Sequence, residues 1–181
     1  MNPYPGRANS LPGGAPADAG GVAEAIVYVE KLPASVVVPP PPTTRPELEQ
    51  RGQAFAPRVL AIQVGTTVEF PNRDPIYHNV FSVSPAKRFD LGKYPKGQSR
   101  RLRFDKPGLV NVFCDIHSDM AAYVFVVPHH VFTRPNDAGR FALPPLPAGS
   151  YVLRAWHPDR GEVTQSVQVP ADGDVAVTVR L

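Results

Sequence analysis

Short runs in which hydrophobic residues alternate with polar ones, or follow one another without a break, make up most of the chain. Alternation with a period of two is typical of a strand with one buried face, and a short unbroken apolar run is typical of a fully buried strand. The pattern predicts strands over residues 23–30, 59–64, 67–70, 78–84, 99–104, 109–113 and 122–127. Further along the chain it predicts strands over residues 140–143, 151–156, 163–169 and 175–181.

Prolines and turn sequences punctuate these runs. There are 23 prolines in 181 residues, and many stand at the ends of apolar runs, where proline is tolerated although it breaks helices. Turn signals such as Lys-Pro-Gly at 106–108 and Asn-Asp-Ala-Gly at 136–139 separate neighbouring runs. Strands this short and closely spaced indicate an all-β protein built as an antiparallel sandwich or barrel.

The chain divides into four segments. Residues 1–20 are rich in Pro, Gly, Ala and Asn and are expected to form a disordered leader. Residues 21–52 contain one strand, a four-proline run at 39–42 and a polar stretch at 43–52, expected as a stiff loop or linker. Residues 53–129 form the first β domain and residues 130–181 a second β unit. The second unit alone would bury only a thin core, so we expect it to pack on the first or to borrow a strand from it.

Composition excludes some classes of function. The formal net charge of +3 is mild, and no basic stretch carries the interleaved aromatic residues that stack on nucleic acid bases. No run approaches the length of a transmembrane helix. We therefore expect neither a nucleic acid partner nor an integral membrane segment.

One segment places three metal-binding side chains at three-residue intervals: Cys114, His117 and Met120. Two imidazoles and a thiolate with a weak axial thioether form the ligand set of blue-copper sites. The segment lies between two predicted strands, so we expect a tight loop that turns these side chains toward one point. The second imidazole must come from elsewhere, and His78 is the natural candidate because it follows a turn at the start of a predicted strand.

Plainer interpretations exist for several of these residues. A lone cysteine is usually an inert buried thiol, and a methionine is usually core packing; the combination with the histidines favours ligation. Asp115 or Asp119 could lie near the metal in place of Met120, which would give a harder site. The remaining histidines are interpreted as surface or turn residues, although the first two could bind adventitious metal: His129, His130 and His157.

Residues 53–128 resemble the cupredoxin family, in particular plastocyanin and amicyanin. The sequence His78-Asn79-Val80 is similar to the family's first ligand strand, in which the Asn ties the two ligand loops together. The family's loop, an aromatic residue followed by Cys-x-x-His and Met, is matched by Phe113, Cys114, His117 and Met120. The short gap between the loop His and Met is similar to amicyanin.

The resemblance implies a Greek-key β-sandwich that binds one type 1 copper ion. It implies the ligands His78, Cys114, His117 and Met120, with Asn79 and Phe113 beside them. Ile116 stands where the relatives usually have proline, and this departure bears on the reduction potential and on the docking surface rather than on ligation.

The second unit resembles the carboxypeptidase regulatory-like (transthyretin-like) sandwich over residues 137–141 and 147–153. The resemblance implies a structural role, and it implies that residues 22–32 pair with this unit, so that the copper domain is inserted between them. The alternative makes residues 22–32 the first strand of the cupredoxin sheet. Val27 beside residues 151–155 supports the insertion, whereas Val27 beside Val64 or Val68 excludes it.

The favoured function is that of a one-electron carrier, because four protein ligands leave no open position for a substrate. The alternative is a copper storage or delivery protein, or a scaffold stabilised by copper. A copper oxidase or reductase needs further copper with several His ligands, which five histidines do not supply convincingly, so we do not expect an enzyme.

A partner and a location follow from charge and chemistry. Residues 87–106 contain eight basic and two acidic residues, interpreted as a solvated hairpin face or as a surface that steers an acidic redox partner to dock near His117. Copper redox chemistry is generally kept outside the cytosol, so we expect a periplasmic or exported protein. Residues 1–20 lack the charged-then-apolar pattern of a signal peptide.

Overall fold

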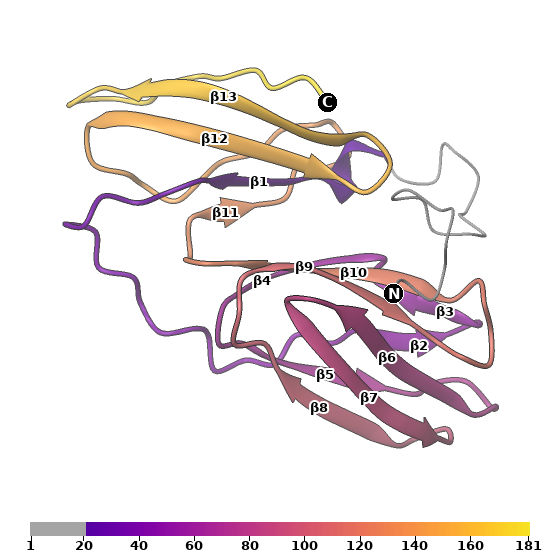
Figure 1. The fold of residues 1–181 in the computed structure, drawn as a ribbon. Helices are drawn as coiled ribbons and strands as arrows, with labels where there is room; N and C mark the ends of the chain where they lie inside the picture. Colours follow the sequence, from indigo (N-terminus) through magenta and orange to yellow (C-terminus); the bar gives the residue numbers. More distant parts are fainter. Residues whose placement is uncertain (1–20) are drawn as a thin grey trace.

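Two β units lie one above the other in the computed structural model, which describes residues 21–181 (Figure 1). The lower unit holds a five-stranded sheet of order β4-β10-β9-β6-β7 and two small sheets, β5-β8 and β2-β3; the upper unit is a four-stranded sheet of order β11-β1-β12-β13. Within the described residues the one helical element is the 3-10 turn η1 (Val22–Glu24). The prediction of an all-β protein is confirmed. The expected leader, residues 1–20, lies outside the described residues.

Several of the longer strands lie where the hydrophobic pattern predicts them, and others were not predicted. The strands of the lower unit are β2 (Glu49–Arg51), β3 (Ala54–Ala56), β4 (Val59–Gln63), β5 (Thr67–Pro71), β6 (His78–Ser84), β7 (Lys87–Tyr94), β8 (Ser99–Arg103), β9 (Gly108–Phe113) and β10 (Ala121–Val127). Those of the upper unit are β1 (Ile26–Val29), β11 (Phe132–Thr133), β12 (Gly149–His157) and β13 (Gly161–Val169). No helix among residues 21–181 has the length and apolar character needed to cross a bilayer.

Strand β10 is buried on both faces. It pairs in parallel with β4 and antiparallel with β9. Ala122, Val124 and Val126 pack into the core of the lower unit. The alternate residues Tyr123, Phe125 and Val127 pack against the upper unit. This double burial explains why residues 121–127 read as an unbroken apolar run rather than as an alternation.

The core of the lower unit lies between the five-stranded sheet and the β5-β8 pair. Val68 and Phe70 from β5 pack with Val80 and Val112 from the large sheet, and all four are fully buried. Cys114 and Met120 belong to this same apolar cluster. The loop between β9 and β10 is therefore anchored at both ends in the core.

Strand β1 belongs to the upper sheet although it precedes the lower unit in sequence. Val27 lies opposite Ala155 on β12 and opposite Thr133 on β11. The chain leaves the upper sheet after β1, builds the whole lower unit and returns through β10 (Figure 1). This is the pairing that the insertion hypothesis requires, and not the one that places Val27 beside Val64 or Val68.

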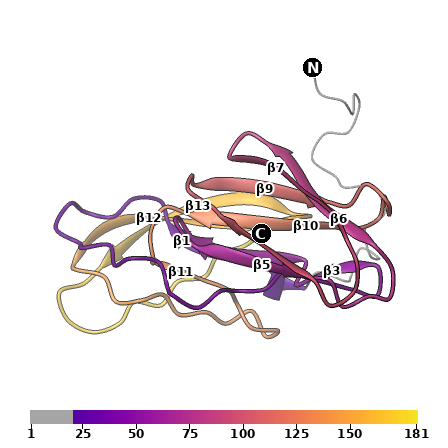
Figure 2. The same ribbon diagram turned by 90° about the horizontal axis from the view of Figure 1, so that it is seen from below.

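The two units share an apolar interface. Ile26 from β1 and Val59 from β4 are fully buried there. The Trp156 ring lies 5.4 Å from the ring of Tyr123 and 5.2 Å from that of Phe125. In the view from below, β12 and β13 lie behind the lower unit (Figure 2). The second unit packs on the first, as its small size led us to expect.

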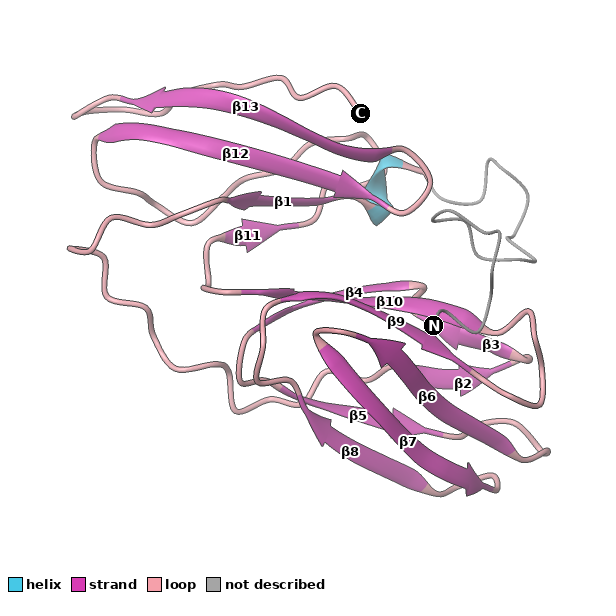
Figure 3. Cartoon of the chain, viewed as in Figure 1, coloured by secondary structure: helices cyan, strands magenta, loops and turns pink. Residues whose placement is uncertain are grey.

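The structure corrects three expectations about elements. The polar stretch 43–52 is not wholly a linker, because Leu48 is fully buried and Glu49–Arg51 form β2. Residues 140–143 and 175–181 are not strands but loops (Figure 3). The side chains of Leu143 and Val177 pack on the upper sheet. These segments are therefore apolar, like strands, although their backbones do not pair with the sheet.

Candidate metal centre

The loop between β9 and β10 is closed by its own backbone. The Cys114 N–H donates to the Met120 carbonyl at 3.3 Å, and the Met120 N–H donates to the His117 carbonyl at 3.0 Å. Phe113, the last residue of β9, lies opposite Ala121, the first of β10. These bonds hold residues 114–120 in a tight turn, as the spacing of the loop residues predicts.

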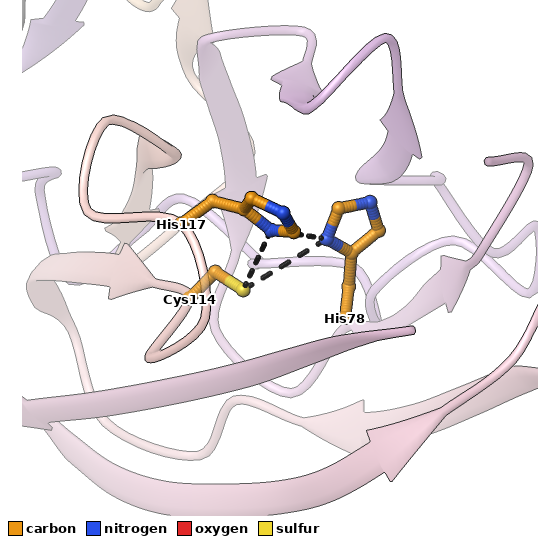
Figure 4. Close-up of side chains that lie close together, drawn as sticks. All are labelled: His78, Cys114 and His117. Carbon is orange, nitrogen blue, oxygen red and sulfur yellow. Dashed lines mark hydrogen bonds between the residues drawn. The ribbon is translucent and has the colours of Figure 1, made fainter. Parts of the chain in front are cut away.

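Three side chains from two elements converge at this end of the lower unit. His78 is the first residue of β6, which pairs with β9 where Phe81 lies opposite Phe113. The Nδ1 atoms of His78 and His117 are 3.1 Å apart, and Cys114 Sγ lies 3.9 Å from the first and 4.0 Å from the second (Figure 4). Donors this close can surround one ion whose bonds are about 2.0–2.3 Å long.

Burial of the three donors is unequal. His78 is 0% exposed and Cys114 is 4% exposed, whereas His117 is only half-buried. Two imidazoles and a thiolate, withdrawn from water on one side, fit a copper ion better than a hard cation such as Mg²⁺ or Ca²⁺. Among the Cys, His, Asp and Glu residues of 21–181, these three form the cluster with metal-binding geometry.

Met120 and the two loop aspartates occupy different surroundings. Met120 is 1% exposed and packs in the same apolar cluster as Cys114. Asp115 and Asp119 are exposed, and Asp115 Oδ2 pairs with Lys93 Nζ at 3.5 Å. Neither carboxylate joins the cluster of His78, Cys114 and His117.

Asn79 and Phe113 are the sequence neighbours of His78 and Cys114. Asn79 Oδ1 accepts a hydrogen bond from the Asp115 N–H at 2.7 Å, which ties β6 to the loop. Its Nδ2 donates to Asp90 Oδ1 at 3.2 Å. The Phe113 ring packs on Phe81 with 5.8 Å between ring centroids.

Asp74 is a neighbour of the cluster that the sequence reasoning missed. Its Oδ2 lies 2.8 Å from His78 Nε2, on the side of the ring away from Cys114. Burial raises the pKa of the Asp74 carboxyl, but hydrogen bonds from the N–H groups of Gln53 and Gly52 and from His78 outweigh it and hold this pKa below its usual value. The sequence feature that could have identified Asp74 is its position in the turn that leads to His78, four residues before it.

The other histidines lie elsewhere in the molecule. His129 and His157 are 4% and 1% exposed, so their interpretation as surface residues is wrong. Each Nδ1 accepts a backbone N–H two residues ahead, from Val131 and from Asp159. Burial lowers the pKa of His129. His130 is half-buried, and none of the three joins the cluster of His78, Cys114 and His117.

Comparison with known proteins finds similarity among solved structures only. No protein-family model matches the chain, and no curated protein matches it. A copper-containing nitrite reductase from Thermus scotoductus SA-01 is 29% identical over 55% of this chain, with a TM-score of 0.45. The chain spans 25% of the length of that reductase.

Two smaller proteins match over almost their whole length. A purple cupredoxin from Nitrosopumilus maritimus is 23% identical, over 45% of this chain and 99% of its own, with a TM-score of 0.42. A reduced mutant of amicyanin is 21% identical, over 56% of this chain and 98% of its own, with a TM-score of 0.44. These two matches cover about half of this chain, and we infer the chemistry of the site from its geometry.

Proposed function

We propose that the chain binds one copper ion through His78, Cys114 and His117, with Met120 as a weak axial ligand, and that it carries one electron at a time. The convergence of one thiol and two imidazole nitrogens within about 4 Å of one another carries this proposal. This is the donor set of type 1 copper sites. The bound ion would supply the change of oxidation state, and the chain supplies the fixed ligands around it.

The surroundings of the donors favour electron transfer over catalysis. The backbone bonds of the loop and the Asn79 bridge restrain Cys114 and His117. A ligand set held this firmly changes little between two oxidation states, so little has to be reorganised when an electron arrives. Four ligands from the chain would leave no open position for a substrate, and we therefore propose a carrier rather than an enzyme.

Electrons would enter and leave at the His117 edge. His117 is half-buried whereas His78 has no exposed surface. The residues preceding the two histidines, Ile116 and Tyr77, are 41% and 58% exposed. A redox partner protein that covers these apolar side chains would come within reach of the His117 ring. The docking surface would then be the end of the lower unit that holds the ligand loop.

Positive charge on β7, on β8 and in the turn between them supports an acidic partner. Lys93 and Arg101 pair with carboxylates of the chain itself. Arg88 and Lys96 are exposed and form none of the ion pairs found among residues 21–181. Uncompensated positive charge of this kind raises the rate of association with an acidic protein. Added salt screens the charge and reduces this increase in rate. We place this exchange in the periplasm or outside the cell, where copper redox chemistry is generally kept.

The test of the metal site is the absorption spectrum of the full chain loaded with Cu(II). Coordination of the Cys114 thiolate should give an intense visible charge-transfer band, and Cys114→Ser should abolish this band while circular dichroism shows an unchanged fold. The control is Ser118→Ala in the same loop, which should keep the band. A chain that stays colourless with Cu(II) and binds only Cu(I) would instead support copper storage or delivery.

A further inference from the structure

The buried carboxylate of Asp74 lies within hydrogen-bond distance of the His78 ring, at the nitrogen that faces away from Cys114. Its Oδ2 lies 2.8 Å from His78 Nε2, and the Asp74 residue is 6% exposed. We infer that Asp74 is a positioning residue that fixes His78 for copper and lowers the reduction potential of the site. This inference rests on the proposed function, because it concerns the same copper ion.

The β2-β3 turn fixes the carboxylate. Asp74 Oδ1 accepts the Gly52 N–H, and Oδ2 accepts the Gln53 N–H at 2.8 Å as well as the His78 ring. Gly52 and Gln53 have φ of 64° and 58°, the left-handed backbone of a two-residue hairpin turn. Because Gln53 is not glycine, its conformation is disfavoured in isolation, and the bond that its N–H makes to the carboxylate compensates for this.

A second buried side chain fixes the segment that carries Asp74. Asn72 is 0% exposed, and its Nδ2 donates to the carbonyls of Ile76 and Tyr94, both at 2.9 Å. Its Oδ1 accepts the Asp74 N–H at 2.9 Å. Residues 72–78 therefore form a rigid bend in which the position of the carboxylate relative to His78 is determined by the backbone.

The bond determines which nitrogen of His78 is free. An ionised carboxylate can only accept, so Nε2 carries the hydrogen and Nδ1 keeps its lone pair on the side of Cys114 and His117. A carboxylate behind a ligand imidazole orients the ring and raises its basicity. The negative charge also stabilises Cu(II) relative to Cu(I), which lowers the potential.

The two histidines of the site are therefore unequal. Among the described residues, the hydrogen-bond-range contacts of the His117 ring are those of its Nδ1 with His78 and Cys114. No carboxylate of residues 21–181 holds the His117 ring as Asp74 holds that of His78. His78, oriented by Asp74, would hold the metal in place. His117 would present the exposed edge of the site to a partner.

Two substitutions separate charge from hydrogen bonding. Asp74→Asn can keep an acceptor oxygen facing Nε2 and removes the charge, and Asp74→Ala removes both. Copper affinity, measured by competition with a chromophoric chelator, should fall about 10–100-fold in Asp74→Ala. The potential of the copper-loaded chain, measured by voltammetry, should become more positive in Asp74→Asn.

Asp105→Asn is the control, because Asp105 is an exposed carboxylate of the lower unit whose ion pairs within residues 21–181 are with Lys87 and Arg103. It should leave affinity and potential unchanged. If the unsubstituted chain binds copper and Asp74→Asn has the same potential as Asp105→Asn, the inference is wrong and the proposed function stands. If the unsubstituted chain binds no copper, the proposed function itself fails. A merely structural role would lower the melting temperature of the apo-protein in Asp74→Asn without changing the potential.

Discussion

The proposed ligands are held by three kinds of local structure. Cys114 and His117 lie in a turn closed by backbone hydrogen bonds, and His78 starts a strand and is held through Nε2 by Asp74. Met120 is placed by its burial in the core beside Cys114. Removal of any one of these side chains should therefore have its own signature.

Met120→Leu tests the axial position. Leucine nearly conserves the volume, so the free energy of unfolding should change by less than about 1.5 kcal/mol. Loss of a thioether that donates to Cu(II) should raise the potential while the charge-transfer band persists, and voltammetry together with the optical spectrum measures both. An unchanged potential would make Met120 a core residue and not a ligand.

The sequence was more informative about the donors than about the residues that orient them. Cys114, His117 and Met120 stand at fixed short spacing, and spacing is visible in a sequence. Asp74 resembles any acidic residue of a turn, and the N–H groups that hold it come from residues 52 and 53 on another hairpin. Such long-range hydrogen bonds depend on how the hairpins pack together. The local pattern of the sequence carries no information about that packing.

At the scale of elements, apolar periodicity predicted strands where burial decides the structure. β10 and β12 appeared as expected because their side chains fill cores. β7 (Lys87–Tyr94) was not predicted, because its exposed basic residues mask the weaker signal of Phe89 and Leu91. Residues 175–181 alternate like a strand, yet the chain there packs through side chains without ladder bonds.

Phe125 on β10 tests the interface between the two units. It is 8% exposed, and its ring contacts those of Tyr28 and Trp156. Phe125→Ala should lower the free energy of unfolding by about 3–5 kcal/mol, since it leaves a cavity between the sheets. Chemical denaturation measures this loss.

The matched control for that experiment is Val83→Ala on β6, a site that is 41% exposed. It should change the unfolding free energy by about 0.5 kcal/mol or less. A loss in Phe125→Ala no larger than in Val83→Ala would mean that the two units do not stabilise each other.

At the scale of the whole molecule, the upper sheet packs on the lower unit, which carries the proposed copper site. β1 and β12 bracket the lower unit in sequence and meet in one sheet, where Val27 lies opposite Ala155. The aromatic interface joins this sheet to the face of β10 away from the lower core. We propose that this fusion holds β10, and with it one end of the ligand loop, in a fixed position.

Voltammetry of the copper-loaded full chain tests the central claim most directly. A reversible one-electron wave is predicted, with the same peak positions over repeated cycles, because the ligands are held by the fold in both oxidation states. Cys114→Ser should show no such wave. An irreversible response, or loss of copper on each oxidation, would contradict an electron carrier.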